Sequence, residues 1–385
     1  MRAFIFPGQG SQAKGMGKEL FDKYPELVEK ADKILGYSIK ELCLEDPENK
    51  LNNTQYTQPA LYTVNALSYY DEVDTSGEKP DFLAGHSLGE YNALLAAGCF
   101  DFEAGLKLVK KRGELMSQVK DGAMAAIMNS SKAEIEQILA DNNLTNVDLA
   151  NYNSPTQIVI SGASDEIAAA KSVFSFGKVL FYPLNTSGAF HSRFMQESRD
   201  KFRTYAKRFK YAEPQIPVIS NVTAEPYKEG ELITNLPEQI SSTVMWSDSI
   251  LHLLSIDKDM EFKEIGHGNV LTKLVAGIKR HVKKEQQAQA QAQAKNNTRT
   301  EPVKAAEQAE PTAQPKAAAV SHDSVVEKVK AWNAKHPVGT KVKSSMPGYE
   351  ALETRSEAVV LFSHRAAVYM KGYNGYFDLD EIQAL

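Results

Sequence analysis

The chain has 385 residues, a formal net charge of −5 and two cysteines, Cys43 and Cys99. At about 150 residues per domain this length predicts two to three domains, while the negative charge argues against nucleic acid or an anionic membrane as a partner. Two cysteines exclude a disulfide scaffold and a four-thiolate zinc site. There is no run of about 18 apolar residues to cross a membrane, and the apolar stretch before Pro7 is too short for a signal peptide. We therefore expect a reduced, cytoplasmic protein of more than one domain.

The first 282 residues alternate short apolar strands with helical segments. Strands are predicted at 3–6 and 82–84, and helices at 21–35, 59–70, 89–97 and 102–116. Alternation of this kind is typical of parallel strands joined by helical crossovers. The pattern predicts an α/β fold with a hydrolase-like parallel-sheet core.

The order of predicted strands and helices changes within residues 123–186. Strands are predicted at 124–128, 147–150, 157–161 and 178–184, and helices at 132–142 and 165–174. The order βαββαβ is that of a ferredoxin-like subdomain. We expect it to be inserted into the larger domain of residues 1–282 and to form a cleft there, where substrate sites tend to lie.

Composition changes abruptly near Lys283. Residues 283–322 contain no aromatic residue and two large aliphatic ones, Val303 and Val320. Such a segment buries too little apolar surface to offset its ordering entropy, so we expect a disordered Ala/Gln/Pro linker. A solvated helix packed on the first domain is the alternative.

Residues 323–385 follow as a short independent segment. A helix is predicted at 323–336, and apolar runs at 340–342, 358–362 and 366–370 predict short strands separated by glycine turns. The segment is near the lower size limit for independent folding. We expect a small β-rich module of SH3-like type, with docking to another enzyme as a hypothesis for its role.

The motif Gly85-His86-Ser87-Leu88-Gly89 carries the clearest chemistry. It follows a predicted strand and opens a predicted helix, which is the context of a nucleophile elbow. The turn lifts Ser87 clear of the sheet, and the Leu88 amide and the helix N-terminus then face a developing oxyanion. We predict that Ser87 is a catalytic nucleophile.

A nucleophilic serine needs a base, and the chain has eight histidines. Three lie in the linker and tail, and His86 is adjacent to Ser87 on a tight turn, so it points elsewhere. His191, His252, His267 and His281 remain, and spacing alone does not choose among them.

Several sequence blocks, in one order, resemble the malonyl-CoA:acyl-carrier-protein transacylase family, and more narrowly the free-standing acyltransferases of polyketide synthases. The resemblance covers residues 1 to about 282. The blocks are Phe6-Pro7-Gly8-Gln9-Gly10-Ser11-Gln12, Gly85-His86-Ser87-Leu88-Gly89-Glu90, Lys111-Arg112-Gly113, Asn151-Tyr152-Asn153-Ser154-Pro155, Gly188-Ala189-Phe190-His191-Ser192 and Gly266-His267-Gly268.

The resemblance implies a role for several residues at the reacting centre. Ser87 would carry the acyl group as an ester, and His191 would be its general base. A backbone carbonyl at Gln239 would orient the histidine, although Thr243 stands where the family usually has proline. Gln9 and the Leu88 amide would donate hydrogen bonds to the oxyanion.

Two further residues would select the substrate. Arg112 would grip the malonyl carboxylate with its planar guanidinium, whereas the residues alone leave open a solvated arginine on a helix surface. Phe190 matches the block of malonyl-selecting relatives, and those that take methylmalonyl have a smaller residue there.

The implied reaction moves malonyl from malonyl-CoA, through Ser87, to the phosphopantetheine thiol of an acyl carrier protein. It would supply extender units for polyketide or fatty acid biosynthesis without a metal or a bound cofactor. A hydrolase that clears stalled acyl groups and a non-catalytic docking subunit are the alternatives. Acidic carrier proteins would need a basic patch, for which the candidates are Lys110, Lys111, Arg193, Arg199, Lys201, Arg203, Lys207 and Arg208.

Overall fold

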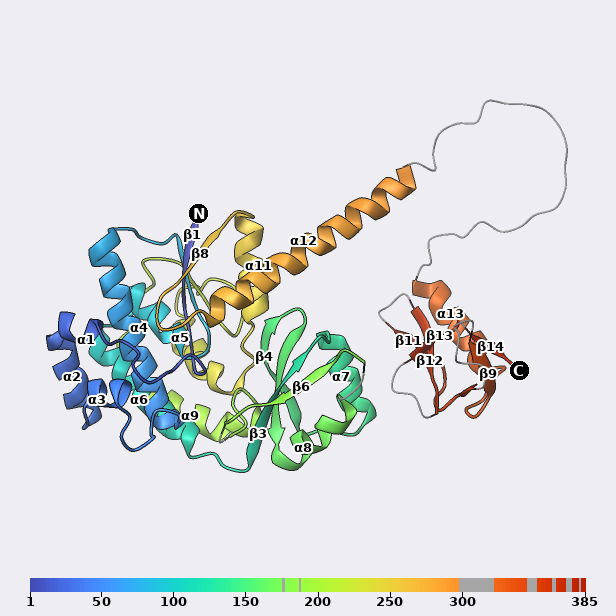
Figure 1. Ribbon diagram of the computed structural model, residues 1–385, viewed down its shortest axis with the longest axis horizontal. Coiled ribbons are helices and arrows are strands. Elements are labelled where there is room, and N and C mark those ends of the chain that lie inside the picture. Colours follow the sequence, from blue (N-terminus) through green and yellow to red (C-terminus); the bar gives the residue numbers. More distant parts are fainter. Residues whose placement is uncertain are drawn as a thin grey trace. The chain divides into compact units, whose positions relative to one another are not determined.

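A computed structural model describes residues 1–174, 177–186, 188–297, 322–344, 352–361, 365–371, 376–380 and 382–385. The chain divides into two compact units, Met1–Thr298 and Arg299–Leu385 (Figure 1). Within the described residues, no helix is both long enough and apolar enough to cross a membrane.

A parallel sheet lies at the centre of the first unit, in the strand order β7-β2-β1-β8. Its strands are β1 (Arg2–Phe6), β2 (Phe82–Gly85), β7 (Val218–Ile219) and β8 (Glu261–Glu264). Every neighbouring pair is parallel, so the predicted α/β class with a parallel sheet is confirmed. The apolar pattern did not predict β7 or β8, because β7 is two residues long and β8 carries three charged residues.

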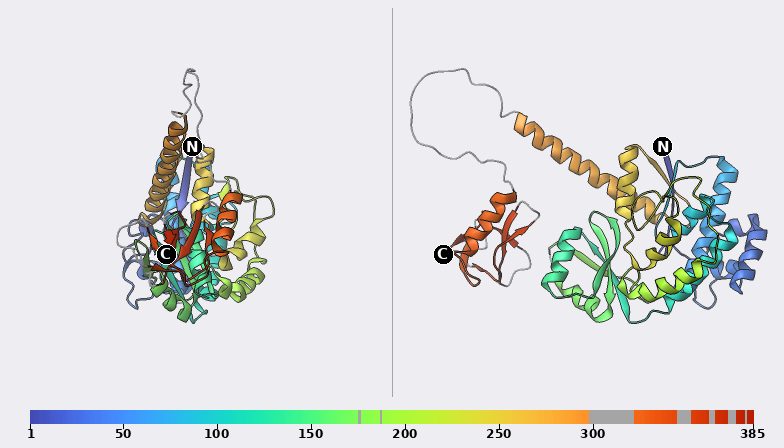
Figure 2. Two further views of the ribbon diagram at one scale, coloured as in Figure 1. Left: turned by 90° about the vertical axis from the view of Figure 1, so that its right-hand side faces the viewer. Right: turned by 180° about the vertical axis from the view of Figure 1, so that it is seen from behind.

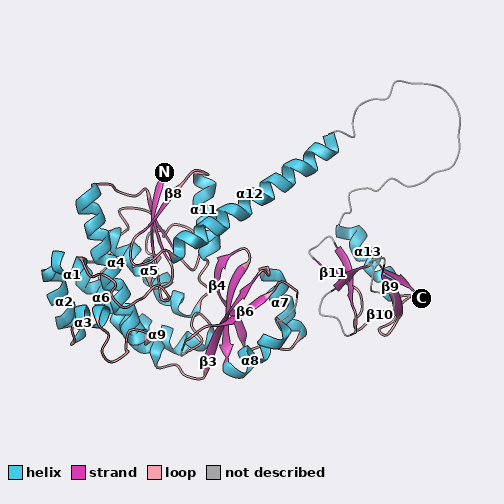
Figure 3. Ribbon diagram, viewed as in Figure 1, coloured by secondary structure: helices cyan, strands magenta, loops and turns pink. Residues whose placement is uncertain are grey.

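Helices cover both faces of this sheet (Figure 3). Successive side chains of a strand point to opposite faces, and in β1 Phe4 and Phe6 enter one apolar core while Ala3 and Ile5 enter another. The helices that contribute buried residues to the larger core are α1 (Leu20–Lys23), α2 (Pro25–Leu35), α3 (Ile39–Leu44), α4 (Thr54–Ser76), α5 (Gly89–Ala96), α6 (Phe102–Ser117), α9 (Gln196–Ala206) and α10 (Leu232–Glu238). Those that contribute to the smaller core are α11 (Trp246–Ile256) and α12 (Val270–Asn297).

The predicted helix at 21–35 is interrupted, because Pro25 occupies the first turn of α2 and a new helix begins there. Helix α4 is longer than predicted at both ends. The Asn53 side chain accepts a hydrogen bond from the Gln55 amide at its start, and Gly77 adopts a left-handed conformation at its end. These two caps define the helix.

Between α6 and the 3-10 helix η1 (Arg193–Met195) the chain forms a second, antiparallel sheet in the order β4-β5-β3-β6. Its elements are β3 (Gly122–Met128), α7 (Lys132–Asp141), β4 (Val147–Ser154), β5 (Gln157–Ala163), α8 (Ser164–Val173) and β6 (Leu180–Pro183). They have an apolar core of their own, to which both helices contribute.

Hydrogen bonds fix this sheet to the core beside the 3-10 helix η2 (Gln239–Ser241). The Val244 amide donates to the Ala150 carbonyl, and the Tyr152 amide donates to the Val244 carbonyl at 2.9 Å. The Thr243 hydroxyl adds a bond of 2.7 Å to the Leu149 carbonyl. The inserted sheet is therefore attached to the segment that contains Gln239.

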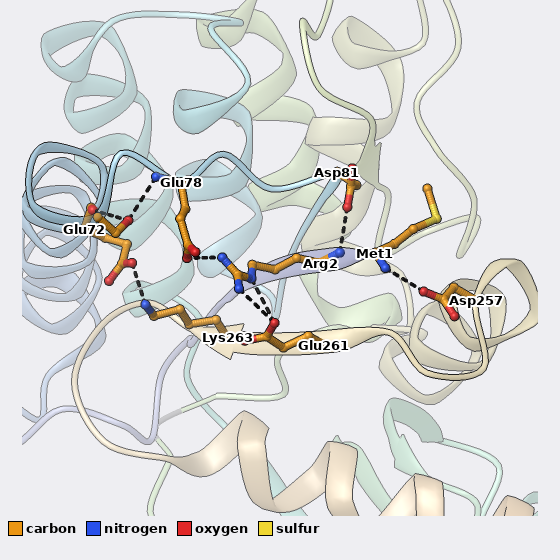
Figure 4. A network of polar contacts seen from close by, with 9 residues as sticks. Met1, Arg2, Glu72, Glu78, Asp81, Asp257, Glu261 and Lys263 are labelled. Atoms are coloured by element: carbon orange, nitrogen blue, oxygen red, sulfur yellow. Dashed lines mark hydrogen bonds and ion pairs between the residues drawn. The ribbon is translucent and has the colours of Figure 1, made fainter.

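Charged side chains anchor the beginning of β1 (Figure 4). The Met1 amino group lies 2.7 Å from Asp257, and the Arg2 guanidinium bonds to Glu261 on β8. The Arg2 amide also donates to Asp81 ahead of β2. Exposed pairs of this kind contribute about 0–1 kcal/mol each, so their main effect is to fix strand ends in place.

Helix α12 continues to Asn297, past residue 282 where we expected the linker to begin (Figure 2). Ala, Gln and Lys have high helix propensities, and no proline occurs between Lys283 and Pro302. The helix therefore occupies the start of the expected linker, whose remainder up to residue 321 lies outside the described residues.

The described residues of the second unit form a helix and two antiparallel three-stranded sheets, β10-β9-β14 and β11-β12-β13. Its elements are α13 (His322–Asn333), β9 (Lys341–Ser344), β10 (Leu352–Glu353), β11 (Val359–Leu361), β12 (Arg365–Tyr369), β13 (Tyr376–Asp378) and β14 (Ile382–Ala384). Val342, Val368 and Met370 are fully buried within it. The Asn333 side chain bonds to both the amide and the carbonyl of Ala358, which ties the helix to the start of β11.

Candidate active site

Ser87 occupies a sharp turn between β2 and α5, at the carboxyl end of the parallel sheet. Its φ angle is 51°, in the left-handed region that non-glycine residues rarely adopt. A Cβ atom on Gly85 would lie 2.0 Å from the Gly89 carbonyl carbon, and one on Gly89 would lie 2.0 Å from the Phe6 carbonyl oxygen. The two glycines are therefore required by the close approach of strand and helix at this turn.

His191 lies against Ser87, with 2.8 Å between Nε2 and the serine Oγ. Its Nδ1 is 2.9 Å from the backbone carbonyl oxygen of Gln239. A carbonyl oxygen can only accept, so Nδ1 must carry the proton and Nε2 is left to accept from the serine hydroxyl. Burial, and then the charge of Arg112, lower the pKa of His191 to about 3. The imidazole is therefore neutral and able to take a proton.

Arg112, on α6, is 1% exposed. Its Nη2 donates to the Ser87 Oγ at 3.0 Å and to the Gln239 Oε1 at 2.8 Å, and the guanidinium lies over the Tyr91 ring. Burial lowers the Arg112 pKa from its ordinary value. The structure therefore places this arginine at the nucleophile, which excludes the solvated helix-surface arginine that the residues alone left open.

Gln239 is hydrogen-bonded to the buried carboxylate of Glu90, which was not among the predicted site residues. Its Nε2 donates to the Ser87 carbonyl at 2.8 Å and to Oε2 of Glu90. The Tyr227 hydroxyl and the Asn221 amide donate to the other Glu90 oxygen. Burial raises the pKa of Glu90 to about 7.

Asn221 also supports the turn itself. Its Oδ1 accepts from the Ser87 amide, and its Nδ2 donates to the Gly85 carbonyl, both at 2.7 Å. No spacing rule could have found Asn221, which is far along the chain. Glu90 had a signal, because it is the one charged residue in the otherwise neutral helix Gly89–Ala96.

The chain matches a known family over most of its length. Residues 3–327 match the sequence profile described as "Acyl transferase domain". This chain belongs to the acyl transferase family. It is therefore an acyltransferase, and several matched relatives are named as transacylases.

Among these relatives are two polyketide biosynthesis malonyl CoA-acyl carrier protein transacylases. BaeC from Bacillus velezensis is 52% identical over 281 residues, which is 72% of this chain and 97% of that protein. PksC from Bacillus subtilis is 53% identical and covers 73% of this chain and 98% of its own. The polyketide biosynthesis protein PksE is 55% identical, but the match spans only 36% of its length.

Solved structures of malonyl transacylases are also similar to this chain. The malonyl CoA-acyl carrier protein transacylase of Burkholderia pseudomallei is 55% identical, with a TM-score of 0.72 over 73% of this chain and 98% of its own. A structure named as a type II polyketide carrier protein in complex with its malonyl-transacylase is 32% identical, with a TM-score of 0.67.

Leu88, Gln9 and Phe190 are the other residues predicted to belong to the site. Leu88 is fully buried directly after Ser87 and precedes α5. The Gln9 side-chain amide donates to Thr54 Oγ1 at 3.2 Å, so it is directed at the start of α4. Phe190 is buried in the larger core, next to His191.

His86 belongs to the contact with the inserted sheet. Its Nε2 lies 2.8 Å from Asn153 Oδ1 on β4, and its ring packs against Trp246. Burial lowers its pKa. These contacts direct the ring away from the serine, as its place in the turn predicted.

Two surface grooves lie near these elements. One, of about 730 Å³, runs between β4, α7 and the η1 and η2 segments, and its lining includes His191, Tyr152 and Thr243. The other, of about 540 Å³, lies between α6 and α9 and is lined by Lys107, Lys110, Lys111, Lys201 and Arg208.

The lining of the second groove includes Lys110, Lys111, Lys201 and Arg208 of the predicted basic patch. Two of these are paired with acids on their own helices, Lys111 with Glu114 and Lys201 with Glu197. Arg193 bonds to Asp148, and both Arg199 and Arg203 bond to Glu238. Among the residues that the structure describes, no cluster of three His, Cys, Asp or Glu side chains could hold a metal ion.

Proposed function

We propose that this acyltransferase moves malonyl from malonyl-CoA to the phosphopantetheine thiol of an acyl carrier protein, and that it serves a polyketide pathway in the cytoplasm. The observation that carries the proposal is the buried Arg112 guanidinium, 3.0 Å from the Ser87 Oγ. A cation beside a nucleophile favours an acyl group that carries its own carboxylate. The names of BaeC and PksC support the same substrate and pathway.

In the first half-reaction, Ser87 attacks the thioester carbonyl carbon of malonyl-CoA while its proton moves to His191 Nε2. The tetrahedral oxyanion would accept hydrogen bonds from the Leu88 amide and from Gln9, after that side chain leaves Thr54. When the carbon–sulfur bond breaks, the coenzyme A thiolate takes the proton from His191. The product is a malonyl ester of Ser87 and a neutral histidine.

In the second half-reaction, the phosphopantetheine thiol of the carrier protein occupies the place that coenzyme A left. His191 takes the thiol proton, and the sulfur attacks the ester carbonyl. The oxyanion collapses, the bond to Ser87 breaks, and the serine oxygen regains its proton from His191. The Gln239 carbonyl holds the required tautomer through both halves.

Arg112 would hold the malonyl carboxylate through two parallel charge-assisted hydrogen bonds. This contact also aligns the thioester carbonyl with the serine. Phe190, next to His191, would limit the space at the α-carbon of the acyl group. One methyl group is worth about 1–3 kcal/mol in such a pocket, so methylmalonyl would be disfavoured rather than excluded.

The domain assignment that accompanies this function has two parts. We assign the inserted sheet to the ferredoxin-like type, supported by its element order and by the strand order β4-β5-β3-β6. We assign the second unit to a small module of SH3-like type that docks the enzyme to another protein, supported by its separate apolar core.

Mass spectrometry of the intact protein tests the proposal. Incubation with malonyl-CoA should add one malonyl group at Ser87, and holo carrier protein should then remove it and become malonylated. Ser87→Ala should give no adduct. Release of free malonate at the rate of adduct loss, with the carrier protein unchanged, would instead identify a hydrolase. An absence of any adduct would favour a non-catalytic docking subunit.

A further inference from the structure

Glu90 is a buried carboxylate that the reaction described above does not use. It is the second residue of α5, three positions after the nucleophile, and its side chain is fully inaccessible to solvent. Three donors converge on it: the Tyr227 hydroxyl at 2.5 Å, the Asn221 amide at 3.2 Å and the Gln239 Nε2. The amide and Nε2 cannot accept a proton, so this arrangement favours the ionised carboxylate.

The Glu90 charge determines which end of the Gln239 amide faces Arg112. Because Nε2 donates to Glu90 and to the Ser87 carbonyl, Oε1 must point the other way, where it accepts from Arg112 Nη2 at 2.8 Å. A flipped amide would put oxygen against a carboxylate and a carbonyl, and nitrogen against a guanidinium. All three contacts would then be repulsive.

Glu90 also balances the buried charge of Arg112. A guanidinium that is 1% exposed needs a partner for its charge. Between these two described residues the connection runs through the Gln239 amide, and no direct ion pair joins them. A directly paired arginine would have to give up its carboxylate to bind another one, whereas this relay leaves the guanidinium available to a ligand.

We propose that Glu90 is a positioning residue, which holds Arg112 ready for the malonyl carboxylate by fixing the orientation of the Gln239 side chain. The inference rests on the proposed function and goes beyond it, because it assigns Glu90 on α5 a part in selecting malonyl. Acetyl transfer would use the same nucleophile, base and oxyanion donors, but it offers no carboxylate to Arg112. Loss of Glu90 should therefore affect malonyl more than acetyl.

The test compares malonyl-CoA and acetyl-CoA as donors to a holo carrier protein at pH 8, in the full-length enzyme. Glu90→Gln should raise the KM for malonyl-CoA about 10–100-fold, the range for losing one charge-assisted contact, and lower the malonyl-over-acetyl ratio of kcat/KM about tenfold or more. Glu90→Asp keeps the charge and should recover part of that ratio. Glu238→Gln, which removes the charge of a partly exposed acid next to Gln239, should leave the malonyl-over-acetyl ratio of kcat/KM unchanged and is the matched control.

Equal losses for the two donors in a Glu90→Gln enzyme of unchanged Tm would overturn the proposal, because they indicate a general structural role. A wild-type enzyme that transfers no malonyl would instead overturn the proposed function, before Glu90 enters the question.

The pH dependence of KM in the wild-type enzyme tests the proposal even if Glu90→Gln does not fold. The groups that face Glu90 are Arg112 on α6, Tyr91 on α5 and Tyr227 in the β7–α10 connection. Burial raises the pKa of both tyrosines above the ordinary value, and arginine stays charged, so none of the three titrates near neutrality. The KM for malonyl-CoA should rise as pH falls from 8 to 6 while that for acetyl-CoA stays constant. A malonyl KM that does not change over this range would overturn the proposal.

Discussion

Ser87 and His191 share an uncommon backbone conformation: their φ angles are 51° and 57°, and Oγ of one lies 2.8 Å from Nε2 of the other. Each non-glycine residue with such a φ costs about 1–3 kcal/mol. The Asn221 side chain holds the Ser87 amide, and the Gln239 carbonyl holds the imidazole. Two positions that the fold strains are thus the two whose side chains must meet.

The first prediction concerns the base. His191→Ala should lower kcat for malonyl transfer about 10²–10⁴-fold, the range for losing a positioned general base. Seryl ester formation, followed by intact mass at short times, measures it. His252→Ala removes a histidine that the sequence also left open and should retain wild-type kcat. A loss of equal size in both variants would contradict the assignment of His191.

The second prediction concerns the carboxylate contact. Arg112→Ala should reduce kcat/KM for malonyl-CoA about 100-fold or more, because a buried charge-assisted pair is lost. Acetyl-CoA lacks the carboxylate and should lose much less. Lys111→Ala changes a neighbouring cation on the same helix and should leave the donor preference intact. Equal losses for both donors in Arg112→Ala would rule out the contact.

The third prediction concerns the turn. Gly89→Ala should lower the stability of the first unit by about 2 kcal/mol or more, because the added methyl group meets the Phe6 carbonyl. Gly277→Ala, in α12, meets only an arginine side chain at 4.0 Å and should stabilise the helix by about 0.5–1 kcal/mol. Thermal unfolding followed by circular dichroism should show Tm shifts of opposite sign.

The fourth prediction concerns pH and stability. Burial lowers the pKa of His191 to about 3 and raises that of Glu90 to about 7. Between about pH 4.5 and 6.5 the unfolded chain binds a proton at His191 that the folded chain does not, so stability falls as pH falls. Glu90 acts in the opposite sense, because the folded chain binds the extra proton there. The two dependences offset each other in the wild type, and His86, whose pKa burial also lowers, adds to that of His191.

Glu90→Gln removes the opposing dependence. The free energy of unfolding should therefore fall more steeply on acidification in this variant, by about 1.4 kcal/mol per pH unit. Urea unfolding at half-unit steps from pH 5 to 6.5 measures the slope, with Glu238→Gln as control. Identical slopes for wild type and Glu90→Gln would show that Glu90 does not bind a proton in the folded chain over this range.

The fifth prediction concerns the two units. Each has its own apolar core. Truncation after Thr298 should therefore leave the Tm of the first unit and its rate of seryl ester formation unchanged. A loss of either would mean that the second unit contributes to the catalytic unit directly.

The sequence by itself determined the features that depend on neighbours along the chain. Gly85 and Gly89 flank Ser87 within one turn, so the need for glycine at both positions can be recognised from a short sequence motif. The alternation of apolar runs determined the α/β class and the parallel sheet, because side-chain periodicity follows local backbone geometry. Composition alone predicted a separate C-terminal unit. Helix α12 ends later than predicted, because strong helix formers follow Lys283.

Only the tertiary structure decided which side chains meet at the site. Family resemblance suggested His191, but the residues alone left four histidines open, and 104 positions separate it from Ser87. The sequence left Arg112 open as a surface residue, and its burial against Gln239 joins positions 127 apart. Asn221 and Tyr227 were missed for the same reason. The charge of Glu90 is visible in the sequence, but its partners Asn221, Tyr227 and Gln239 lie far along the chain. Contacts across such separations depend on how the elements pack, and no local periodicity or spacing records that packing.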